Sequence, residues 1–209
     1  QNAKMPAITG GVGVCHTYVD ANANLKDALA IVVNAKVQRP TVCNALDTVL
    51  VHQAVARDFL PELATEFGVQ DVELRADGRA MSLIDAMAGG SKATPAQSDD
   101  FGTEFLSLVA SVKIVDSMDE AVAHIGEYGS GHSEAIISDD AEAVERFLNE
   151  IDAGVVLANT STRFNDGAEF GLGAEVAIST NKLHARGPMG LKEITSYKWK
   201  VRGSGQERK

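Results

Sequence analysis

The chain has 209 residues, 44% of them hydrophobic and 23% charged, which is enough for one sizeable folded domain, or a domain plus an arm. Its formal net charge of −10 argues against a general nucleic-acid-binding role, because neutralising phosphates requires a basic surface. No stretch approaches the roughly 20 apolar residues that cross a bilayer, and no signal peptide is visible, so we expect neither a nucleic-acid nor a membrane partner.

The first part of the chain alternates short strand-like runs with amphipathic helices. The pattern predicts strands at residues 14–19, 48–52 and 72–74, and helices with apolar residues at helical spacing at 25–37 and 54–67.

Residues 86–103 interrupt this periodicity. Their glycines and polar residues, including the segment 88–92, predict an exposed loop, either functional or a plain surface excursion. The hydrophobic pattern resumes at 105–115, which predicts a strand.

The second part of the chain repeats the alternation. Ser117 and Glu120 form a capping box that predicts the start of a helix running through His124 and Ile125. The further predicted elements are a strand at 134–138, a helix starting at Asp139, a buried strand at 154–158, and a C-terminal edge strand at 196–201 with a frayed tail. This alternation predicts an α/β fold with a mainly parallel sheet covered by helices.

The two cysteines, Cys15 and Cys43, are too few for a disulfide framework in a chain that can build its own core. Cys15 lies in a strand-like apolar run and is expected to be a buried small hydrophobe. Cys43 follows Lys36 and Arg39 within seven residues, and nearby cations favour the reactive thiolate. From the residues alone, Cys43 is as consistent with a plain buried thiol as with an activated nucleophile.

Motifs for metals and dinucleotides do not stand out. The glycine-rich segment at 167–173 lacks the strand–GxGxxG–helix context of a dinucleotide fingerprint, so a loop that allows close backbone approach is the safer interpretation. The histidines and cysteines lack the spacing typical of zinc ligands, and we expect no metal site.

Five motifs together are typical of one family: TGGVGVCH at 9–16, NAKVQRPTVCN at 34–44, YGSGHSE at 128–134, NTSTRF at 159–164 and LHARGPMGL at 183–191. On these motifs the chain resembles the aldehyde dehydrogenase superfamily, and within it the family of γ-glutamyl phosphate reductases, also called glutamate-5-semialdehyde dehydrogenases, of proline biosynthesis. The resemblance runs nearly end to end and departs freely only around residues 75–100.

The resemblance implies a longer chain of which these residues form the second half. Residues 1–180 would be the catalytic thiol domain, and residues 181–209 would be an arm that contacts the cofactor domain and joins a homo-oligomer. The first residue is Gln1 and not methionine, which agrees with a piece of a protein whose NADPH-binding N-terminal half is absent. We therefore expect the isolated chain to be inactive as a reductase.

The family's catalytic nucleophile falls on Cys43. The implied reaction converts L-glutamyl 5-phosphate to L-glutamate 5-semialdehyde and phosphate through a cysteine thioester, with NADPH as the hydride donor. Glu104 aligns with the glutamate that holds the nicotinamide ribose in aldehyde dehydrogenases, and a solvated carboxylate is the alternative. Glutamate 5-kinase is the implied pathway partner, and the implied location is the cytoplasm.

Arg163, with Ser161 and Thr162, follows a predicted buried strand, where parallel sheets place ligand sites. A guanidinium pairs with a carboxylate or phosphate in bidentate fashion, so these three residues are predicted to anchor the substrate. Lys36 and Arg39 are rival candidates for the phosphate, and ordinary surface ion pairs are the alternative for all three cations.

Two other functions remain open. A hydrolytic aldehyde dehydrogenase domain would oxidise a semialdehyde to an acid. The resemblance places Thr9 where many such enzymes carry a glutamate base, and a threonine cannot activate water at neutral pH. The isolated fragment could instead be a folded, non-catalytic oligomerisation module.

Overall fold

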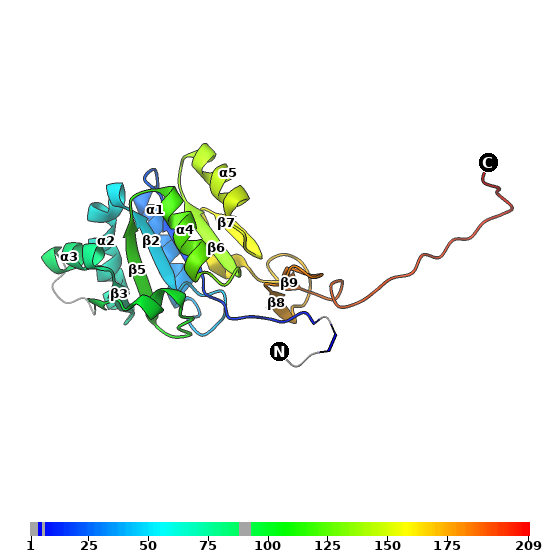
Figure 1. Ribbon diagram of the computed structural model, residues 1–209, viewed down its shortest axis with the longest axis horizontal. Coiled ribbons are helices and arrows are strands. Elements are labelled where there is room, and N and C mark those ends of the chain that lie inside the picture. The colour runs from blue at the N-terminus through cyan, green and yellow to red at the C-terminus, as the bar shows by residue number, and fades with distance from the viewer. Residues whose placement is uncertain (1–3, 6, 88–92) are drawn as a thin grey trace.

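The computed structural model describes residues 4–5, 7–87 and 93–209, so the centre of the expected loop, at 88–92, lies outside the described residues. Figure 1 shows a sheet flanked by helices, with the C-terminal segment leaving this body as an extended tail. Among the described helices, none combines the length and hydropathy of a membrane span.

Seven strands form the central sheet, in the order β4-β3-β5-β2-β1-β6-β7. Their bounds are β1 His16–Val19, β2 Thr48–His52, β3 Glu73–Ala76, β4 Ala93–Pro95, β5 Val109–Val115, β6 Ser133–Ile137 and β7 Val155–Ala158. All neighbouring strands in this sheet pair in parallel, which confirms the predicted α/β fold.

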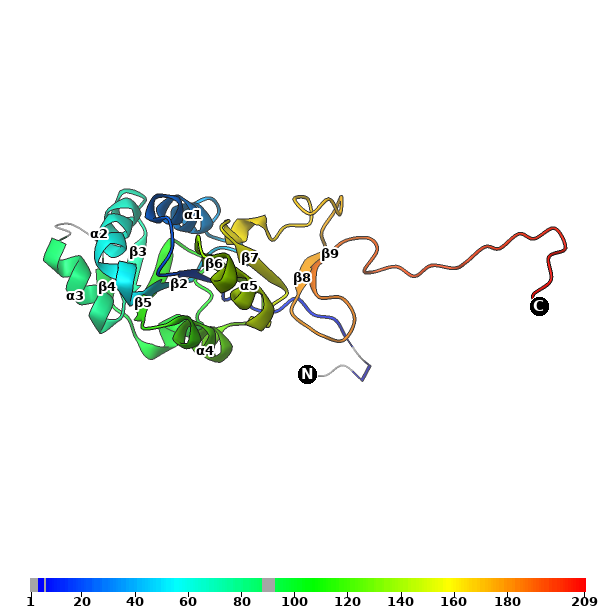
Figure 2. The same cartoon turned by 90° about the horizontal axis from the view of Figure 1, so that it is seen from above.

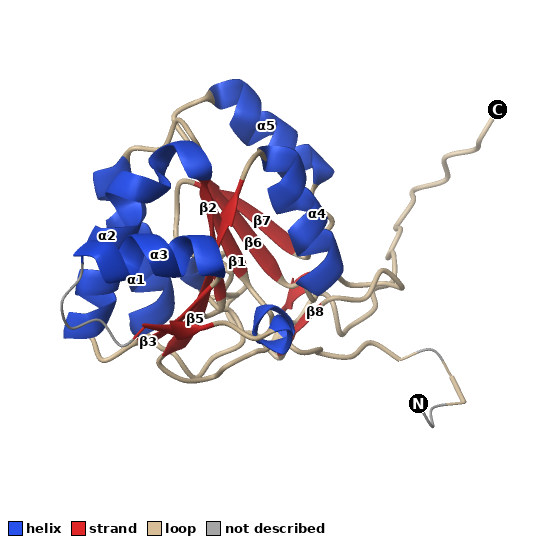
Figure 3. Ribbon diagram, turned by 60° about the vertical axis from the view of Figure 1, so that its left-hand side comes forward, coloured by secondary structure: helices blue, strands red, loops and turns tan. Residues whose placement is uncertain are grey.

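Helices cover both faces of the sheet (Figures 2 and 3). One face carries α1 (Leu25–Val37), α2 (Gln53–Val69) and α3 (Gly78–Met87), and the other carries α4 (Met118–Tyr128) and α5 (Ala141–Glu150). From β1 to β4 the strands progress toward one edge, and from β5 to β7 they progress toward the other. Because crossovers between parallel strands are right-handed in nearly all proteins, this reversal moves the later helices to the opposite face.

Alternate residues of β2 face opposite layers, since side chains along a strand point alternately to the two sides of a sheet. Val49 and Val51 pack into the larger core with α1, α2 and α3. Leu50 joins Tyr18 and Phe147 in the second core, under α4 and α5. All five side chains are buried, as expected for a parallel sheet covered on both faces.

Side-chain caps fix the starts of the later helices. The Ser117 hydroxyl accepts the Glu120 amide, which confirms the predicted start of α4, but the Glu120 carboxylate accepts the amide of Asp116 and not that of Ser117. The cap of α5 is Asp140, whose carboxylate accepts two amides of the first turn. The helix start predicted at Asp139 is therefore wrong, because α5 begins at Ala141.

The exposed loop predicted at 86–103 is wrong for much of its length, and the periodicity does not reveal α3. This helix covers the start of the segment, β4 pairs with β3, and a 3-10 turn spans Ser98–Gly102. Asp100 in this turn is buried because its carboxylate pairs with Arg75 and accepts the Gln97 amide at 2.7 Å. A polar residue can be buried when it is paired, and sequence polarity alone does not show the pairing.

The C-terminal region contains an antiparallel hairpin of β8 (Ala177–Ser179) and β9 (Gly187–Met189), and the described chain forms no strand after it. The edge strand predicted at 196–201 is therefore wrong for this chain. Tyr197 and Trp199 are 85% and 84% exposed, and the segment runs away from the body (Figure 1). Alternating hydrophobicity predicts two faces, but a strand also needs a hydrogen-bonding neighbour.

A buried ion pair lies at the start of β2. The Asp47 carboxylate lies 3.8 Å from the Lys36 ammonium, and both side chains are almost fully buried. The same carboxylate accepts the backbone amides of Cys15 at 3.2 Å and of Phe105 at 3.1 Å, while Lys36 donates to the Leu46 carbonyl at 2.7 Å. Burial raises the pKa of Asp47 to about 6 and lowers the pKa of Lys36 to about 8, so both groups remain charged at neutral pH.

Replacing Asp47 by alanine should lower the free energy of unfolding by about 3 kcal/mol, because the Lys36 ammonium loses its buried counter-charge and two amides lose their acceptor. Asp58→Ala removes the same side chain from the exposed face of α2 and should change this free energy by less than about 0.5 kcal/mol. Urea unfolding followed by circular dichroism measures both values. Equal values for the two variants would contradict the role assigned to Asp47.

Candidate active site

Cys43 is half-buried in the loop between α1 and β2. The loop follows the end of α1 and leads into a strand, so Cys43 does not itself begin a helix whose N-terminus would stabilise a thiolate. Two backbone hydrogen bonds fold the loop: the Ala45 amide donates to the Val42 carbonyl and the Leu46 amide donates to the Ala35 carbonyl, both at 3.0 Å. The thiol is thus carried on a turn that packs against the end of α1.

A segment after β7 holds this loop from the other side. The Asn44 side chain donates to the Asn165 carbonyl at 2.9 Å, and the Thr162 hydroxyl donates to the Asn44 carbonyl at 2.7 Å. Arg163 donates to the side-chain oxygen of Asn44 and, at 2.8 Å, to that of Gln38 in α1. Asn44 directly follows Cys43, so these bonds restrict the position of the thiol.

The candidate site residues meet at the amino ends of the strands. Cys43 precedes β2, and Glu104 precedes β5. The expectation that Arg163 lies at the carboxyl ends, where parallel sheets usually bind ligands, is wrong. The chain turns back after β7, and Asn165 donates at 2.7 Å to the hydroxyl of Ser133, the first residue of β6. Arg163 and Cys43 do come together, but at the opposite edge from the one expected.

Gly13 lets two backbone segments touch beneath the thiol. A Cβ at this position would lie 2.1 Å from the carbonyl oxygen of Cys43, closer than any real contact allows. The Cys15 thiol, fully buried as expected, donates to the same carbonyl at 3.2 Å. Gly13 and Cys15 therefore pack against the backbone of the Cys43 loop.

The surroundings of Cys43 oppose ionisation of its thiol. Burial raises the pKa of Cys43, and the carboxylates of Glu104 and Glu175 raise it further. The Arg163 guanidinium lowers the pKa of Cys43, as does a backbone hydrogen bond from the residue's own amide. The thiol is therefore less acidic than the sequence suggested.

The two cations predicted to activate Cys43 are not among the main groups that shift the pKa of its thiol. Lys36 is fully buried and is engaged by Asp47 and the Leu46 carbonyl. Arg39 is exposed just beyond the end of α1. Arg163, which the sequence predicts to be a substrate anchor, is a cation that lowers the pKa of the thiol.

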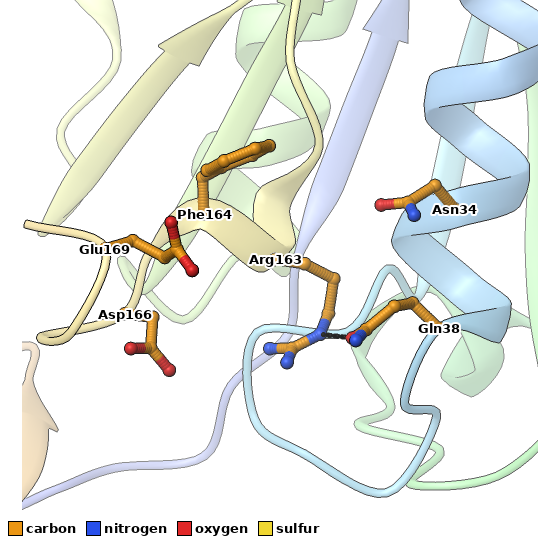
Figure 4. A pocket seen from close by; sticks show the side chains of 6 residues that line it. All are labelled: Asn34, Gln38, Arg163, Phe164, Asp166 and Glu169. Atoms are coloured by element: carbon orange, nitrogen blue, oxygen red, sulfur yellow. Dashed lines mark hydrogen bonds between the residues drawn. The ribbon is translucent and has the colours of Figure 1, made fainter.

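A pocket of about 250 Å³ opens beside this loop (Figure 4). It is lined by side chains from α1 and from the segment after β7: Asn34, Gln38, Arg163, Phe164, Asp166 and Glu169. Arg163, a predicted substrate anchor, thus lines this pocket.

Three of the other predicted anchors, Ser161, Thr162 and Lys36, are supporting residues in this structure. Ser161 and Thr162 are buried; Ser161 caps the short 3-10 turn Thr162–Phe164, and Thr162 bonds Asn44. Lys36 is buried as well, so it does not reach the pocket.

Glu104 is half-buried and lies close enough to Cys43 for its carboxylate to raise the pKa of the thiol. The next residue, Phe105, is fixed by its amide hydrogen bond to Asp47. Thr9 is exposed, and its hydroxyl donates to Asn181 at 3.3 Å. In the ranges that the structure describes, no group of acidic, histidine or cysteine side chains is arranged to hold a metal ion.

Comparison with known proteins matches residues 92–200 to the family model described as Aldehyde dehydrogenase family. A gamma-glutamyl phosphate reductase from Dehalococcoides mccartyi is 59% identical over 208 residues, and the match covers 100% of this chain and 49% of the relative. Another from Roseiflexus castenholzii is 54% identical over 209 residues, with the same two coverages.

Among solved structures, the crystal structure of gamma-glutamyl phosphate reductase from Thermotoga maritima superposes with a TM-score of 0.89 at 43% identity. The match covers 100% of this chain and 49% of that one. The chain thus spans about half the length of the curated relatives it matches.

Iodoacetamide at neutral pH should label Cys43 well before Cys15. Cys43 is half-buried, whereas Cys15 is fully buried and burial raises the pKa of Cys15 well above its ordinary value. Glu104→Gln should speed the labelling of Cys43 and Arg163→Gln should slow it, each roughly threefold, because they remove opposite charges beside the thiol. Peptide mass spectrometry gives the rates. Faster labelling of Cys15, or shifts of the same sign in the two variants, would contradict this description.

Gly13→Ala should displace the Cys43 loop and lower the free energy of unfolding by roughly 2 kcal/mol, because a backbone carbonyl cannot move aside as a flexible side chain can. Gly10→Ala is the matched control in the same segment, since its Cβ would make only ordinary contacts at 3.5 Å and 3.6 Å. Calorimetric unfolding compares the two variants. A Gly13→Ala chain as stable as the control would show that the close approach is not a constraint.

Proposed function

The chain belongs to the aldehyde dehydrogenase family, and we propose that it performs the acyl-transfer step of a γ-glutamyl phosphate reductase. In this proposal Cys43 attacks L-glutamyl 5-phosphate, releases phosphate and carries the acyl group as a thioester, which is then reduced to L-glutamate 5-semialdehyde. The observation that carries the proposal is the half-exposed Cys43 thiol beside Arg163 and its pocket, in a chain whose relatives bear that enzyme's name.

The Cys43 turn supplies two of the requirements for acyl transfer. It holds the thiol in place between α1 and the segment after β7, so the sulfur is positioned before substrate arrives. The Cys43 amide also lowers the pKa of its own thiol. We propose that this amide stabilises the oxyanion that forms when the thiolate attacks an acyl carbon.

The family implies a nicotinamide cofactor, and we propose NADPH. Glu104 is the residue of this chain proposed to hold the nicotinamide ribose, because its carboxylate lies beside Cys43 and carboxylates accept hydrogen bonds from ribose hydroxyls. When bound, the cofactor supplies the hydride that reduces the thioester.

Most contacts to the cofactor are proposed to come from protein outside these 209 residues. The glycine-rich segment 167–173 lies in turns and does not join a strand to a helix, so it lacks the geometry that cradles a pyrophosphate. We also propose that residues 1–180 form the thiol domain and that 181–209 form an arm, whose last residues run away from the body of the chain (Figure 1).

A hydrolytic aldehyde dehydrogenase is the weaker alternative, since Thr9 is bonded to Asn181 and offers no base for water. A role for the arm in a homo-oligomer is compatible with the main proposal. Its residues 196–201 alternate apolar and polar side chains and are exposed, without a strand partner in the described chain. Supply of the substrate by glutamate 5-kinase and a cytoplasmic location belong to the same proposal.

The acyl phosphate is too labile to store, so it is generated in the reaction mixture by incubating the chain with L-glutamate, ATP and glutamate 5-kinase. A γ-glutamyl adduct on Cys43 that hydroxylamine removes is expected by intact-mass spectrometry, since the thioester forms without a hydride donor. Cys43→Ala should abolish the adduct and Cys15→Ser should retain it. The chain alone should show no NADPH-dependent turnover. If the kinase is active in the same reaction and no adduct forms, the proposal is contradicted.

A further inference from the structure

We propose that the pocket beside Cys43 recognises the α-amino-acid head of its substrate, with Arg163 binding the α-carboxylate and with Asp166 and Glu169 binding the α-ammonium group. The inference rests on the proposed function. It extends that function to the groups that select an α-amino acyl phosphate over an acyl phosphate without the amino group.

The pocket sets one cation against two carboxylates. Figure 4 shows the Arg163 guanidinium beside Gln38 on one side and the carboxylates of Asp166 and Glu169 on the other. No ion pair joins Arg163 to either carboxylate in the part of the chain that the structure describes, so the opposite charges face a hollow of about 250 Å³ without neutralising each other. Opposite charges held apart across a small cavity complement a zwitterion.

Neutral partners orient the Arg163 guanidinium. Its Nε donates to the Gln38 side chain at 2.8 Å, and one terminal nitrogen donates to the Asn44 side chain. Both partners are amides, so they fix the plane of the guanidinium and leave its charge intact. A guanidinium carries five N–H donors in a rigid fork, and those not used here remain for a carboxylate.

Asp166 and Glu169 come from one turn. The Asp166 carbonyl accepts the Phe170 amide at 3.0 Å, which closes a helical turn and places positions 166 and 169 on the same side. One oxygen of the Asp166 carboxylate accepts the Ala168 amide at 2.8 Å, and the other remains for an ammonium group. Glu169 is exposed and forms no ion pair with any described residue.

The pocket and the nucleophile are connected through Asn44. This residue follows Cys43 in the chain and accepts a hydrogen bond from Arg163. A γ-glutamyl group has two methylenes between its α-carbon and its acyl carbon. In the proposed complex, these two methylenes span the distance between the head group at Arg163 and the acyl carbon at the thiol.

Protection of Cys43 from iodoacetamide tests this assignment on the chain as it is. L-Glutamate γ-methyl ester carries both charged groups, monomethyl glutarate lacks the ammonium, and methyl 4-aminobutyrate lacks the α-carboxylate. Half-protection by the glutamate ester should need at least about tenfold less compound than half-protection by either partial probe, which is the usual effect of one charged hydrogen bond.

Variants separate the two ends of the pocket. The double variant Asp166→Asn with Glu169→Gln should raise the half-protecting concentration of the glutamate ester by about 10- to 100-fold and should leave that of monomethyl glutarate unchanged. Arg163→Gln should raise the half-protecting concentrations of both carboxylate-bearing probes and should leave that of methyl 4-aminobutyrate unchanged. Glu62→Gln removes an exposed carboxylate from α2, away from this pocket, and should change none of the values.

Equal protection by the glutamate ester and monomethyl glutarate would overturn the assignment, as would an unchanged preference in the double variant. A comparable loss in Glu62→Gln would also overturn it, because a general charge effect would then explain the result. Failure here is distinct from failure of acyl transfer. If an adduct forms on Cys43 but protection shows no amino-acid selectivity, only the proposed head-group pocket is contradicted. If protection is selective but no adduct forms, only the proposed acyl transfer is contradicted.

Discussion

The Asp47 carboxylate joins three segments that are distant in sequence: the end of α1 through Lys36, the start of β1 through Cys15 and the loop before β5 through Phe105. A charge in a protein interior is tolerated only when it is paired and hydrogen-bonded, so satisfying this one carboxylate requires all three segments to meet. Cys43 lies four residues before Asp47, and Glu104 directly precedes Phe105. The candidate nucleophile and the carboxylate beside it therefore share one anchor.

A second set of hydrogen bonds closes the site from the opposite side. The chain after β7 turns back along α1, and its residues 161–165 bond Asn44 by side chain and by backbone. The same contact brings Arg163 to the pocket and to the thiol. One return of the chain thus supplies the support of the Cys43 loop, the cation that lowers the pKa of Cys43 and the proposed substrate anchor.

The sequence predicts most helices and strands of the central sheet, because amphipathic helices carry apolar residues at helical spacing and strands buried on both faces form short apolar runs, but it does not reveal α3 or β4. The motifs also predict Cys43 and Arg163 as site residues, but they do not predict which hydrogen bonds hold these residues in place. The pairing of Lys36 with Asp47, and the bonds of Asn44 and Gln38 to Arg163, join residues that are far apart in sequence or have no periodic pattern. In the sequence, such residues appear only as polar residues near Cys43. Lys36 therefore predicts a cation that activates the thiol, whereas in the structure it is buried and paired with Asp47.

The acidity of Cys43 bears on the acyl donor that suits this site. Burial and two carboxylates raise the pKa of the thiol, so little thiolate exists at neutral pH. Under the proposed function, an α-carboxylate bound to Arg163 offsets the guanidinium charge and raises the pKa of Cys43 further. A thiolate of high pKa is scarce but intrinsically more nucleophilic. The tetrahedral intermediate that it forms expels its less basic group, which is phosphate in an acyl phosphate and the thiolate itself in a simple ester. Under the proposed function, an acyl phosphate therefore suits this cysteine better than an ester does.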